Sequence, residues 1–287
     1  MGTNGQLGNE LRELSVLYND YTFTFIGRSE LDLSNTEDIW TYFIDKTVDI
    51  IINCAAYTAV DKAESEQGIA AEINTRAVET LARIAKAKAI SLIHISTDYV
   101  FDGKNFKPYS ETDPTNPQGV YGQTKLDGEQ AMLAINPPKS IIIRTSWVYS
   151  NFGNNFVKTM LRLGKEREEL GVIYDQVGTP TSARDLALAI MSIIQHPILN
   201  AQKITEIYHF SNEGSCSWYD FAKTIFELSD IHCNVKPIET LDYPTPAKRP
   251  HYSLLNKAKI KNTFDITIPY WKDSLQECID VLKGNKP

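Results

Sequence analysis

The sequence has no long apolar run, no block of basic residues and no signal peptide. No apolar stretch approaches the roughly 18 residues that a membrane-spanning helix needs. The formal net charge is −7, and lysine and arginine form no run. This pattern disfavours a nucleic acid or a membrane surface as a partner. These absences together predict a cytoplasmic protein.

Cysteine is also scarce and shows no pairing motif. The four cysteines, Cys54, Cys216, Cys233 and Cys278, are scattered without a C-x-x-C pair. Because zinc sites and thiol redox centres use closely spaced cysteines, we interpret these as reduced structural thiols. No metal site is predicted.

The first residues carry a glycine pattern at the entrance to a helix. Gly2, Gly5 and Gly8 lie three apart and lead into an amphipathic helical pattern over 9–17. Glycines at such a position let the backbone approach a pyrophosphate, whose charge then lies at the positive helix N-terminus. The G-x-x-G-x-x-G spacing favours the short-chain dehydrogenase branch of dinucleotide-binding folds. A glycine-rich N-terminal tail is the alternative.

A glycine loop of this kind should follow an apolar strand, yet only Met1 precedes Gly2. In a doubly wound sheet the first strand is central, so its two neighbours would lose a partner. The loss would remove much of a net stability of about 5–15 kcal/mol. We hypothesise a truncated or misassigned start of a longer chain, or another segment in that place. A native mass equal to that of this chain would exclude the first option.

Strands and helices alternate through the first half of the chain. The apolar runs at 48–53 and 91–96 are typical of strands covered on both faces of a parallel sheet. A helical pattern over 60–88 separates them. We expect an α/β fold with a Rossmann-type doubly wound parallel sheet and a smaller C-terminal substrate-binding lobe. The dinucleotide-binding domain would comprise 1–147 with a return helix at 181–196, and the lobe 148–180 and 197–287.

The segment 21–26 is rich in aromatic and β-branched residues and is predicted to be a strand ending at Gly27 and Arg28. In dinucleotide folds an acid near this place binds the adenine ribose, whereas an arginine accommodates the extra phosphate of NADP. Arg28 therefore favours NADPH, with NADH possible. A solvated arginine at a strand end is about equally plausible.

A tyrosine and a lysine four residues apart form the candidate catalytic pair. Tyr121 and Lys125 would share one face of a helix that follows a turn-rich loop. An ammonium beside a phenol favours the phenolate, and lowering the pKa by about two to three units requires roughly 3–4 kcal/mol. The preceding strand delivers Thr97 and Asp98 to the edge where α/β sheets bind ligands. An isolated Tyr-x-x-x-Lys is usually ordinary helix surface.

Several motifs together carry a family resemblance that covers almost the whole chain. They are Gly-Thr-Asn-Gly-Gln-Leu-Gly, Ala-Tyr-Thr-Ala-Val-Asp-Lys-Ala-Glu, Ser-Thr-Asp-Tyr-Val-Phe-Asp-Gly, Tyr-Gly-Gln-Thr-Lys, Arg-Thr-Ser-Trp-Val-Tyr, Asp-Gln-Val-Gly-Thr-Pro-Thr and Pro-Ala-Lys-Arg-Pro. As a set they resemble the dTDP-4-dehydrorhamnose reductase family of extended short-chain dehydrogenases. Each motif alone is unspecific.

The resemblance implies reduction of the C4 ketone of dTDP-4-dehydro-L-rhamnose to dTDP-L-rhamnose by NADPH or NADH. Tyr121 would donate the proton, Lys125 would lower its pKa and hold the nicotinamide ribose, and Thr97 would bind the ketone oxygen. The implied substrate contacts are Thr97, Asp98, Trp147 and Arg249. The expected cofactor contacts are Gly2, Gly5, Gln6, Leu7, Gly8, Arg28, Asp32, Leu33, Ala55, Ala56, Tyr57, Thr58, Tyr121 and Lys125.

Some members of the family are described as joining subunits through Mg²⁺. Glu10 and Asp185 occupy plausible places, but a full ligand set cannot be identified, so we predict no metal. A homodimer is compatible with the resemblance.

Two other functions remain open at this point. The regulatory subunit of methionine adenosyltransferase resembles this fold and acts as a binding partner instead of a reductase. A nucleotide-sugar dehydratase or epimerase is the other candidate. Dehydratases typically place an Asp-Glu pair after the threonine, whereas Asp98 is followed here by Tyr99, which favours reduction.

Overall fold

A four-stranded parallel sheet lies at the centre of the computed structural model, which describes residues 1–284. The strand order is β1-β2-β3-β8, with bounds Ile50–Asn53, Ser91–Thr97, Ile141–Thr145 and Glu206–His209. Every residue of β3 is buried, as expected for a strand covered on both faces. The parallel α/β fold predicted from the sequence is confirmed.

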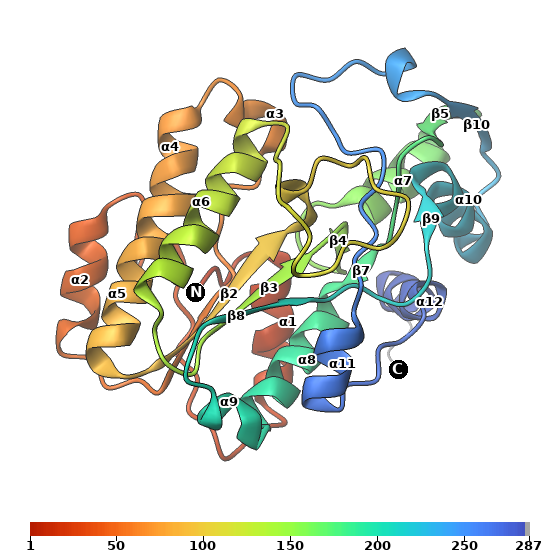
Figure 1. Cartoon of the computed structure of the whole chain (residues 1–287). Coiled ribbons are helices and arrows are strands. Elements are labelled where there is room, and N and C mark those ends of the chain that lie inside the picture. Colours follow the sequence, from red (N-terminus) through yellow and green to blue (C-terminus); the bar gives the residue numbers. More distant parts are fainter. Residues whose placement is uncertain (285–287) are drawn as a thin grey trace.

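Helices cover both faces of this sheet (Figure 1). One face carries α2 (Thr36–Ile44), α5 (Ala77–Lys88) and α6 (Val120–Ile135). The other carries α1 (Gln6–Ser15), α8 (Ala183–Gln195) and α11 (Ala258–Phe264). Each layer buries its own apolar cluster against the strands, which produces the doubly wound arrangement.

The long helix expected over 60–88 is interrupted. It consists of α3 (Val60–Ala63), α4 (Gln67–Ala71), a π-helical turn η1 (Glu72–Arg76) and α5. Residues 64–66 break the first helix, and single π turns often occur at functional sites. Asn74 of η1 bonds the backbone of Tyr57, which lines the candidate site.

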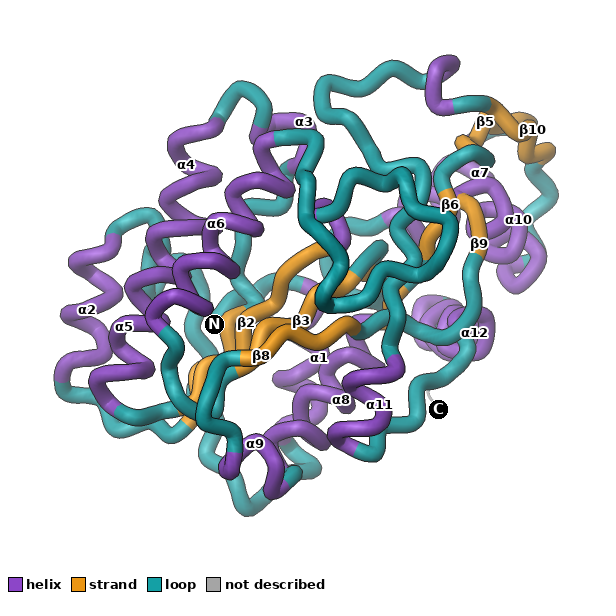
Figure 2. The backbone as a smooth tube through the Cα atoms, in the orientation of Figure 1, coloured by secondary structure: helices purple, strands orange, loops and turns teal. Residues whose placement is uncertain are grey.

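A second, smaller core lies beside the sheet (Figure 2). It packs α7 (Phe156–Glu166), α10 (Trp218–Ser229) and α12 (Trp271–Leu282) around a parallel pair of strands, β5 (Glu169–Ile173) and β10 (Asn234–Ile238). The remaining short elements are η2 (Asp98–Val100), β4 (Val148–Tyr149), β6 (Val177–Gly178), β7 (Thr181–Ser182), α9 (Pro197–Ala201), β9 (Cys216–Ser217) and η3 (Thr240–Asp242).

The segment 197–287, assigned from sequence to the smaller lobe, contributes to both parts. Strand β8 pairs with β3 in the central sheet, and Ile260 and Phe264 of α11 belong to the core beneath that sheet. The rest of the described part of this segment supplies α9, β9, α10, β10, η3 and α12. No helix in 1–284 has both the length and the apolar character required to cross a membrane.

The prediction of a strand over 21–26 is wrong. These residues belong to no strand. Met1 lies between them and β1: its amino group donates to Ile52 O at 2.7 Å, and its carbonyl accepts from Cys54 N at 3.2 Å. Gly2 N then donates to Ile26 O at 3.0 Å. Within residues 1–284, no strand ladder includes 21–26, and the segment contacts the N-terminal backbone at Ile26 O.

A buried ion pair fixes α6 to the sheet. The guanidinium of Arg144 on β3 contacts the carboxylate of Glu129 on α6, with Nε 3.0 Å from Oε1 and Nη2 2.6 Å from Oε2. Ser96 of β2 also donates to Glu129. Both charged side chains are almost fully buried, so their hydrogen bonds must offset a large desolvation cost.

We predict that replacing Arg144 by leucine lowers the free energy of unfolding by about 3–5 kcal/mol, because Glu129 is left buried without a charged partner. Urea unfolding followed by circular dichroism measures the change. The control is Arg83→Leu, which removes an exposed pair with Glu79 and should cost less than about 1 kcal/mol. Equal losses in the two variants would contradict the prediction.

Candidate active site

A cleft of about 820 Å³ opens where β1, β2 and β3 end. Residues that follow each strand line it: Ala55 after β1, Asp98 after β2 and Trp147 after β3. Because the carboxyl ends of parallel strands meet at one sheet edge, this is the expected position for a ligand. Trp218 from the smaller lobe lines the cleft as well, so both cores contribute to it.

Nearly all residues predicted for the site line this cleft. They are Gly2, Gly5, Gln6, Leu7, Arg28, Asp32, Leu33, Ala55, Ala56, Tyr57, Thr58, Thr97, Asp98, Tyr121, Lys125 and Trp147. Two predicted residues, Gly8 and Arg249, are not part of the lining.

The glycine loop forms the entrance of α1. Gly2 has φ of +83°, and a Cβ there would lie 2.8 Å from Ala55 N, so the loop packs directly on the wall after β1. Gly8 lies inside α1 but packs against the loop. A Cβ at Gly8 would lie 2.2 Å from Gly2 O, so a side chain there would displace the loop. Gly5 caps α1 without a side-chain hydrogen bond. The first N–H groups of the helix therefore receive no side-chain cap and suit an anion.

The Tyr121 phenol and the Thr97 hydroxyl meet in the cleft. Side-chain hydrogen bonding with Thr97 acts to lower the pKa of Tyr121. Thr97 Oγ1 also lies 3.0 Å from Asp98 Oδ1. The ring of Tyr99 packs edge-on against Tyr121, with centroids 5.5 Å apart. These contacts place two hydroxyl groups side by side at the end of β2.

The prediction that the pKa of Tyr121 lies below its usual value is wrong in this structure. Burial raises the pKa of Tyr121 to about 12, and the charge of Asp98 acts in the same direction. Lys125 is itself buried beneath the cleft, where its Nζ donates to Ile95 O at 2.7 Å and lies 3.3 Å from His94 Nε2. Burial lowers the pKa of Lys125 to about 8, against the opposing charge of Glu129.

Asn74 ties the wall of the cleft to the tyrosine helix. Its amide binds both backbone groups of Tyr57, accepting from N at 2.9 Å and donating to O at 3.1 Å. The same amide nitrogen lies 3.2 Å from Thr124 Oγ1 on α6. Asn74 therefore fixes the spacing between the predicted cofactor wall and Tyr121.

Comparison with known proteins agrees with this geometry. The family model described as the RmlD substrate binding domain matches residues 1–283. A dTDP-4-dehydrorhamnose reductase of Aggregatibacter actinomycetemcomitans is 43% identical over 282 residues, spanning 96% of this chain and 95% of the relative. The chain belongs to the dTDP-4-dehydrorhamnose reductase family. The resemblance drawn from the motifs is thereby confirmed.

Two solved structures of the family superpose closely on this member. The crystal structure of a dTDP-4-dehydrorhamnose reductase from Clostridium acetobutylicum matches with a TM-score of 0.91 and 44% identity, covering 98% of both chains. The reductase from Bacillus anthracis, solved in complex with NADP, matches with a TM-score of 0.89 and 38% identity. That match covers 97% of this chain and 96% of the other.

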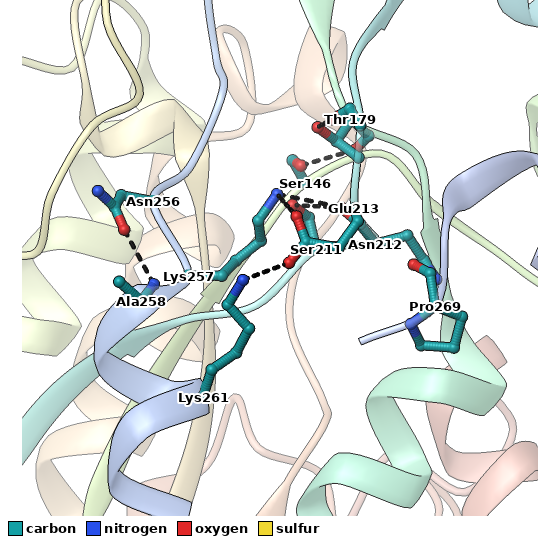
Figure 3. A network of polar contacts seen from close by, with 11 residues as sticks. Ser146, Thr179, Ser211, Asn212, Glu213, Asn256, Lys257, Ala258, Lys261 and Pro269 are labelled. Carbon is teal, nitrogen blue, oxygen red and sulfur yellow. Dashed lines mark hydrogen bonds and ion pairs between the residues drawn. The ribbon is translucent and has the colours of Figure 1, made fainter. Parts of the chain in front are cut away.

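In this family member Trp147 adopts a backbone conformation that is rare outside glycine. Its φ is +48°, a region that costs energy for a bulky residue. Ser146 Oγ donates to Thr179 O at 2.9 Å, and Thr181 N donates to Trp147 O at 3.1 Å (Figure 3 shows the first bond). These bonds hold the indole at the cleft.

Trp218 was missed by the sequence analysis. Its ring stacks on that of Trp147, with centroids 3.6 Å apart and an interplanar angle of 13°. Gly178 also packs closely on Trp147, because a Cβ on Gly178 would lie 2.8 Å from the Trp147 ring. No local signal identifies Trp218, because the stack joins residues 71 positions apart in sequence.

Arg249 is directed to a different partner. Its Nη1 and Nη2 lie 3.0 Å and 2.8 Å from the two carboxylate oxygens of Asp61 on α3. This bidentate pair joins the proline-rich segment 243–250 to the dinucleotide-binding side. The structure therefore gives Arg249 a bridging contact in place of the expected direct position in the cleft.

Arg28 and Asp32 both line the cleft and form an ion pair there. Arg28 Nε is 3.2 Å from Asp32 Oδ2, and its side chain is 76% exposed. Asp32 also accepts from Ser34 N at 2.9 Å, which helps to hold its pKa below the usual value. An exposed pair of this kind is weak, so the guanidinium can turn toward an added phosphate.

Glu10 and Asp185, considered as metal ligands, have protein partners. Ser150 Oγ donates to Glu10 Oε1 at 2.5 Å, and Asn212 Nδ2 donates to Asp185 Oδ2 at 2.6 Å. Throughout the described range, no three or more histidine, cysteine or acidic side chains gather as a metal site would require.

We predict that Asp98→Asn changes how stability depends on pH. Burial raises the pKa of Asp98 to about 6. Between about pH 4 and 6, Asp98 is therefore protonated in the folded protein but ionised in the unfolded chain. Wild-type stability should therefore fall as pH rises through that window. The variant should gain about 2–3 kcal/mol relative to wild type between pH 4 and 7.

Urea unfolding across this pH range measures the difference. The control is Asp102→Asn. Hydrogen bonding from Lys104 N lowers the pKa of Asp102, so this variant should lose stability relative to wild type as pH rises, whereas Asp98→Asn should gain it. A pH-independent difference between wild type and Asp98→Asn would contradict the raised pKa.

Proposed function

We propose that this chain carries out the reaction of its family, the NADPH-dependent reduction of the C4 ketone of dTDP-4-dehydro-L-rhamnose to dTDP-L-rhamnose. The observation that carries the proposal is the convergence of Tyr121, Thr97 and Lys125 on one cleft that also contains the glycine loop of α1. Its place in metabolism would be the biosynthesis of dTDP-rhamnose for cell-surface polysaccharide.

The residues present fit a reduced nicotinamide dinucleotide. The uncapped start of α1 and the close approach of Gly2 to Ala55 provide a cradle for a pyrophosphate. Asp32 and Leu33 line the end suited to the adenosine, with Arg28 placed for the extra phosphate of NADP. When bound, the cofactor supplies the hydride.

The chain's own residues handle the proton and the developing charge. Reduction of a ketone places negative charge on its oxygen, which positioned donors stabilise as it forms. Tyr121 gives its phenolic proton to that oxygen, and Thr97 holds it by a hydrogen bond. Because burial raises the pKa of Tyr121 to about 12, the phenol is fully protonated at neutral pH and available to donate.

The stacked pair of Trp147 and Trp218 gives the substrate a rigid apolar surface at the mouth of the cleft. Asp98 lies beside Thr97 and would accept a sugar hydroxyl. Its Oδ2 is buried and has no protein hydrogen-bond partner among residues 1–284. A buried acceptor without a partner is costly, and a ligand hydroxyl would satisfy it.

We further propose a cytoplasmic protein that acts as a homodimer. The location follows from its proposed need for NADPH and a nucleotide sugar, both products of cytoplasmic metabolism. Light scattering on the purified protein tests the dimer. A mass corresponding to one chain would exclude it.

We predict that Tyr121→Phe lowers kcat by about two to four orders of magnitude, since the variant lacks the proton donor. Binding of NADPH should be nearly unchanged, because only one oxygen is lost. The assay follows NADPH absorbance with the dTDP-keto sugar, and fluorescence titration measures cofactor binding. The matched control is Tyr99→Phe, which removes the neighbouring phenol and should have a much smaller effect.

Unchanged turnover in Tyr121→Phe would remove this residue from the mechanism. If the folded wild-type protein consumes no NADPH with this substrate at any pH, the reductase function is wrong. A role as a binding subunit would then be favoured.

We also predict that Arg28→Ala raises the KM for NADPH about ten- to a hundredfold, as expected for losing a charge-assisted hydrogen bond of about 1.5–3 kcal/mol. NADH lacks the extra phosphate, so the KM for NADH should stay unchanged in the same variant. Steady-state kinetics with both cofactors makes the comparison. An equal rise in both values would show that Arg28 does not recognise that phosphate.

A further inference from the structure

A buried polar chain runs beneath the floor of the cleft and ends at Lys125. Ala55 N donates to Asn53 Oδ1 at 3.2 Å, and Asn53 Nδ2 lies 3.2 Å from His94 Nδ1. His94 Nε2 then lies 3.3 Å from Lys125 Nζ. The side chains of Asn53 and His94 are fully buried, and they face each other across β1 and β2.

The hydrogen bonds of this chain determine the tautomer of His94. A backbone N–H can only donate, so Asn53 must turn its oxygen to Ala55 and its NH₂ to His94. Nδ1 of His94 is then an acceptor. Burial keeps the pKa of His94 well below its ordinary value, so the ring is neutral and carries one proton. That proton must lie on Nε2, which faces Lys125 Nζ.

An N–H group facing Nζ suits an amine and opposes an ammonium. The amine has a lone pair that accepts from His94 Nε2, and it can still donate to Ile95 O at 2.7 Å. The ammonium has three donors and no acceptor. Moving the His94 proton to Nδ1 transfers the conflict to Asn53, and flipping Asn53 transfers it to Ala55. With an ammonium, one contact between two donors remains in every arrangement.

We propose that His94 and Asn53 are positioning residues that present a hydrogen-bond donor to Lys125 and so favour its neutral amine. Lys125 then changes charge within the working range of the enzyme. The inference rests on the proposed function for its catalytic consequence.

Several charged or titratable groups surround Lys125. Burial lowers the pKa of Lys125 to about 8, while Glu129 on the same helix acts to raise it. Glu129 is itself neutralised by Arg144 of β3. Tyr121 and Asp98 share the cleft with Lys125. The ammonium therefore prevails below about pH 8 and the amine above it, which predicts an alkaline decline in kcat/KM as the positive charge is lost.

The first test needs no activity. Two-bond ¹H–¹⁵N spectra of the wild-type protein labelled with ¹⁵N-histidine show which ring nitrogen carries the proton, and His94→Gln identifies the signals among the five histidines. Above the pKa of Lys125, we expect the proton on Nε2. A proton on Nδ1 under these conditions would overturn the proposal, whatever the enzyme's substrate.

The second test reverses the donor and acceptor roles along the hydrogen-bonded series Asn53, His94 and Lys125. In Asn53→Asp, the carboxylate accepts from Ala55 N and from Nδ1–H of His94, so Nε2 becomes an acceptor for the ammonium. We expect the proton of His94 on Nδ1 and the alkaline limb of kcat/KM moved up by about one pH unit or more. The wild-type spectra decide the matter if this variant does not fold.

Asn74→Asp is the matched control. It adds the same charge at another buried asparagine of the cleft wall, one that bonds Tyr57 and Thr124 instead of His94. Its His94 proton should stay on Nε2 and its alkaline limb should move less. An equal displacement in both variants would mean that added charge alone sets the limb, and the positioning role of His94 and Asn53 would be rejected.

Discussion

The buried ion pair between Glu129 and Arg144 is the constraint on which the site depends. Tyr121, Lys125 and Glu129 are spaced four residues apart and share one face of α6. When Glu129 binds Arg144 of β3 and Ser96 of β2, that face must turn toward the sheet. The contact that costs desolvation energy thus fixes the angular position of the two residues that would act on the substrate.

Charge at the site is governed by burial more than by proximity. Burial raises the pKa values of Tyr121 and Asp98 and lowers that of Lys125. Each change favours the neutral form of the group. Proton donation in a reduction requires a neutral phenol, which a tyrosine of ordinary pKa also provides at neutral pH. The direction of the Tyr121 shift is opposite to the expected one and does not by itself favour reduction.

Contacts between distant segments join the two parts of the fold. Outside the cleft lining, Arg249 joins Asp61 of α3, and Lys257 before α11 donates to Asn212 O at 3.2 Å in the segment after β8 (Figure 3). Trp218 brings the smaller core against Trp147 at the end of β3. The strained backbone of Trp147 persists because the Trp218 ring, Gly178 and the bond from Thr181 N to Trp147 O hold it.

Local pattern and spacing were sufficient to predict the parallel sheet, the glycine loop at α1 and the placement of Tyr121 and Lys125 on one helix. Features that depend on distant partners became visible only in the folded chain. Residues 21–26 have strand-like composition, yet in the described structure they join no ladder and hydrogen-bond the N-terminal backbone only at Ile26 O. Arg249 is drawn to Asp61, and the stack of Trp218 on Trp147 forms between segments far apart in sequence. The pKa directions belong to the same class, since they follow from burial, which exists only once the chain has folded.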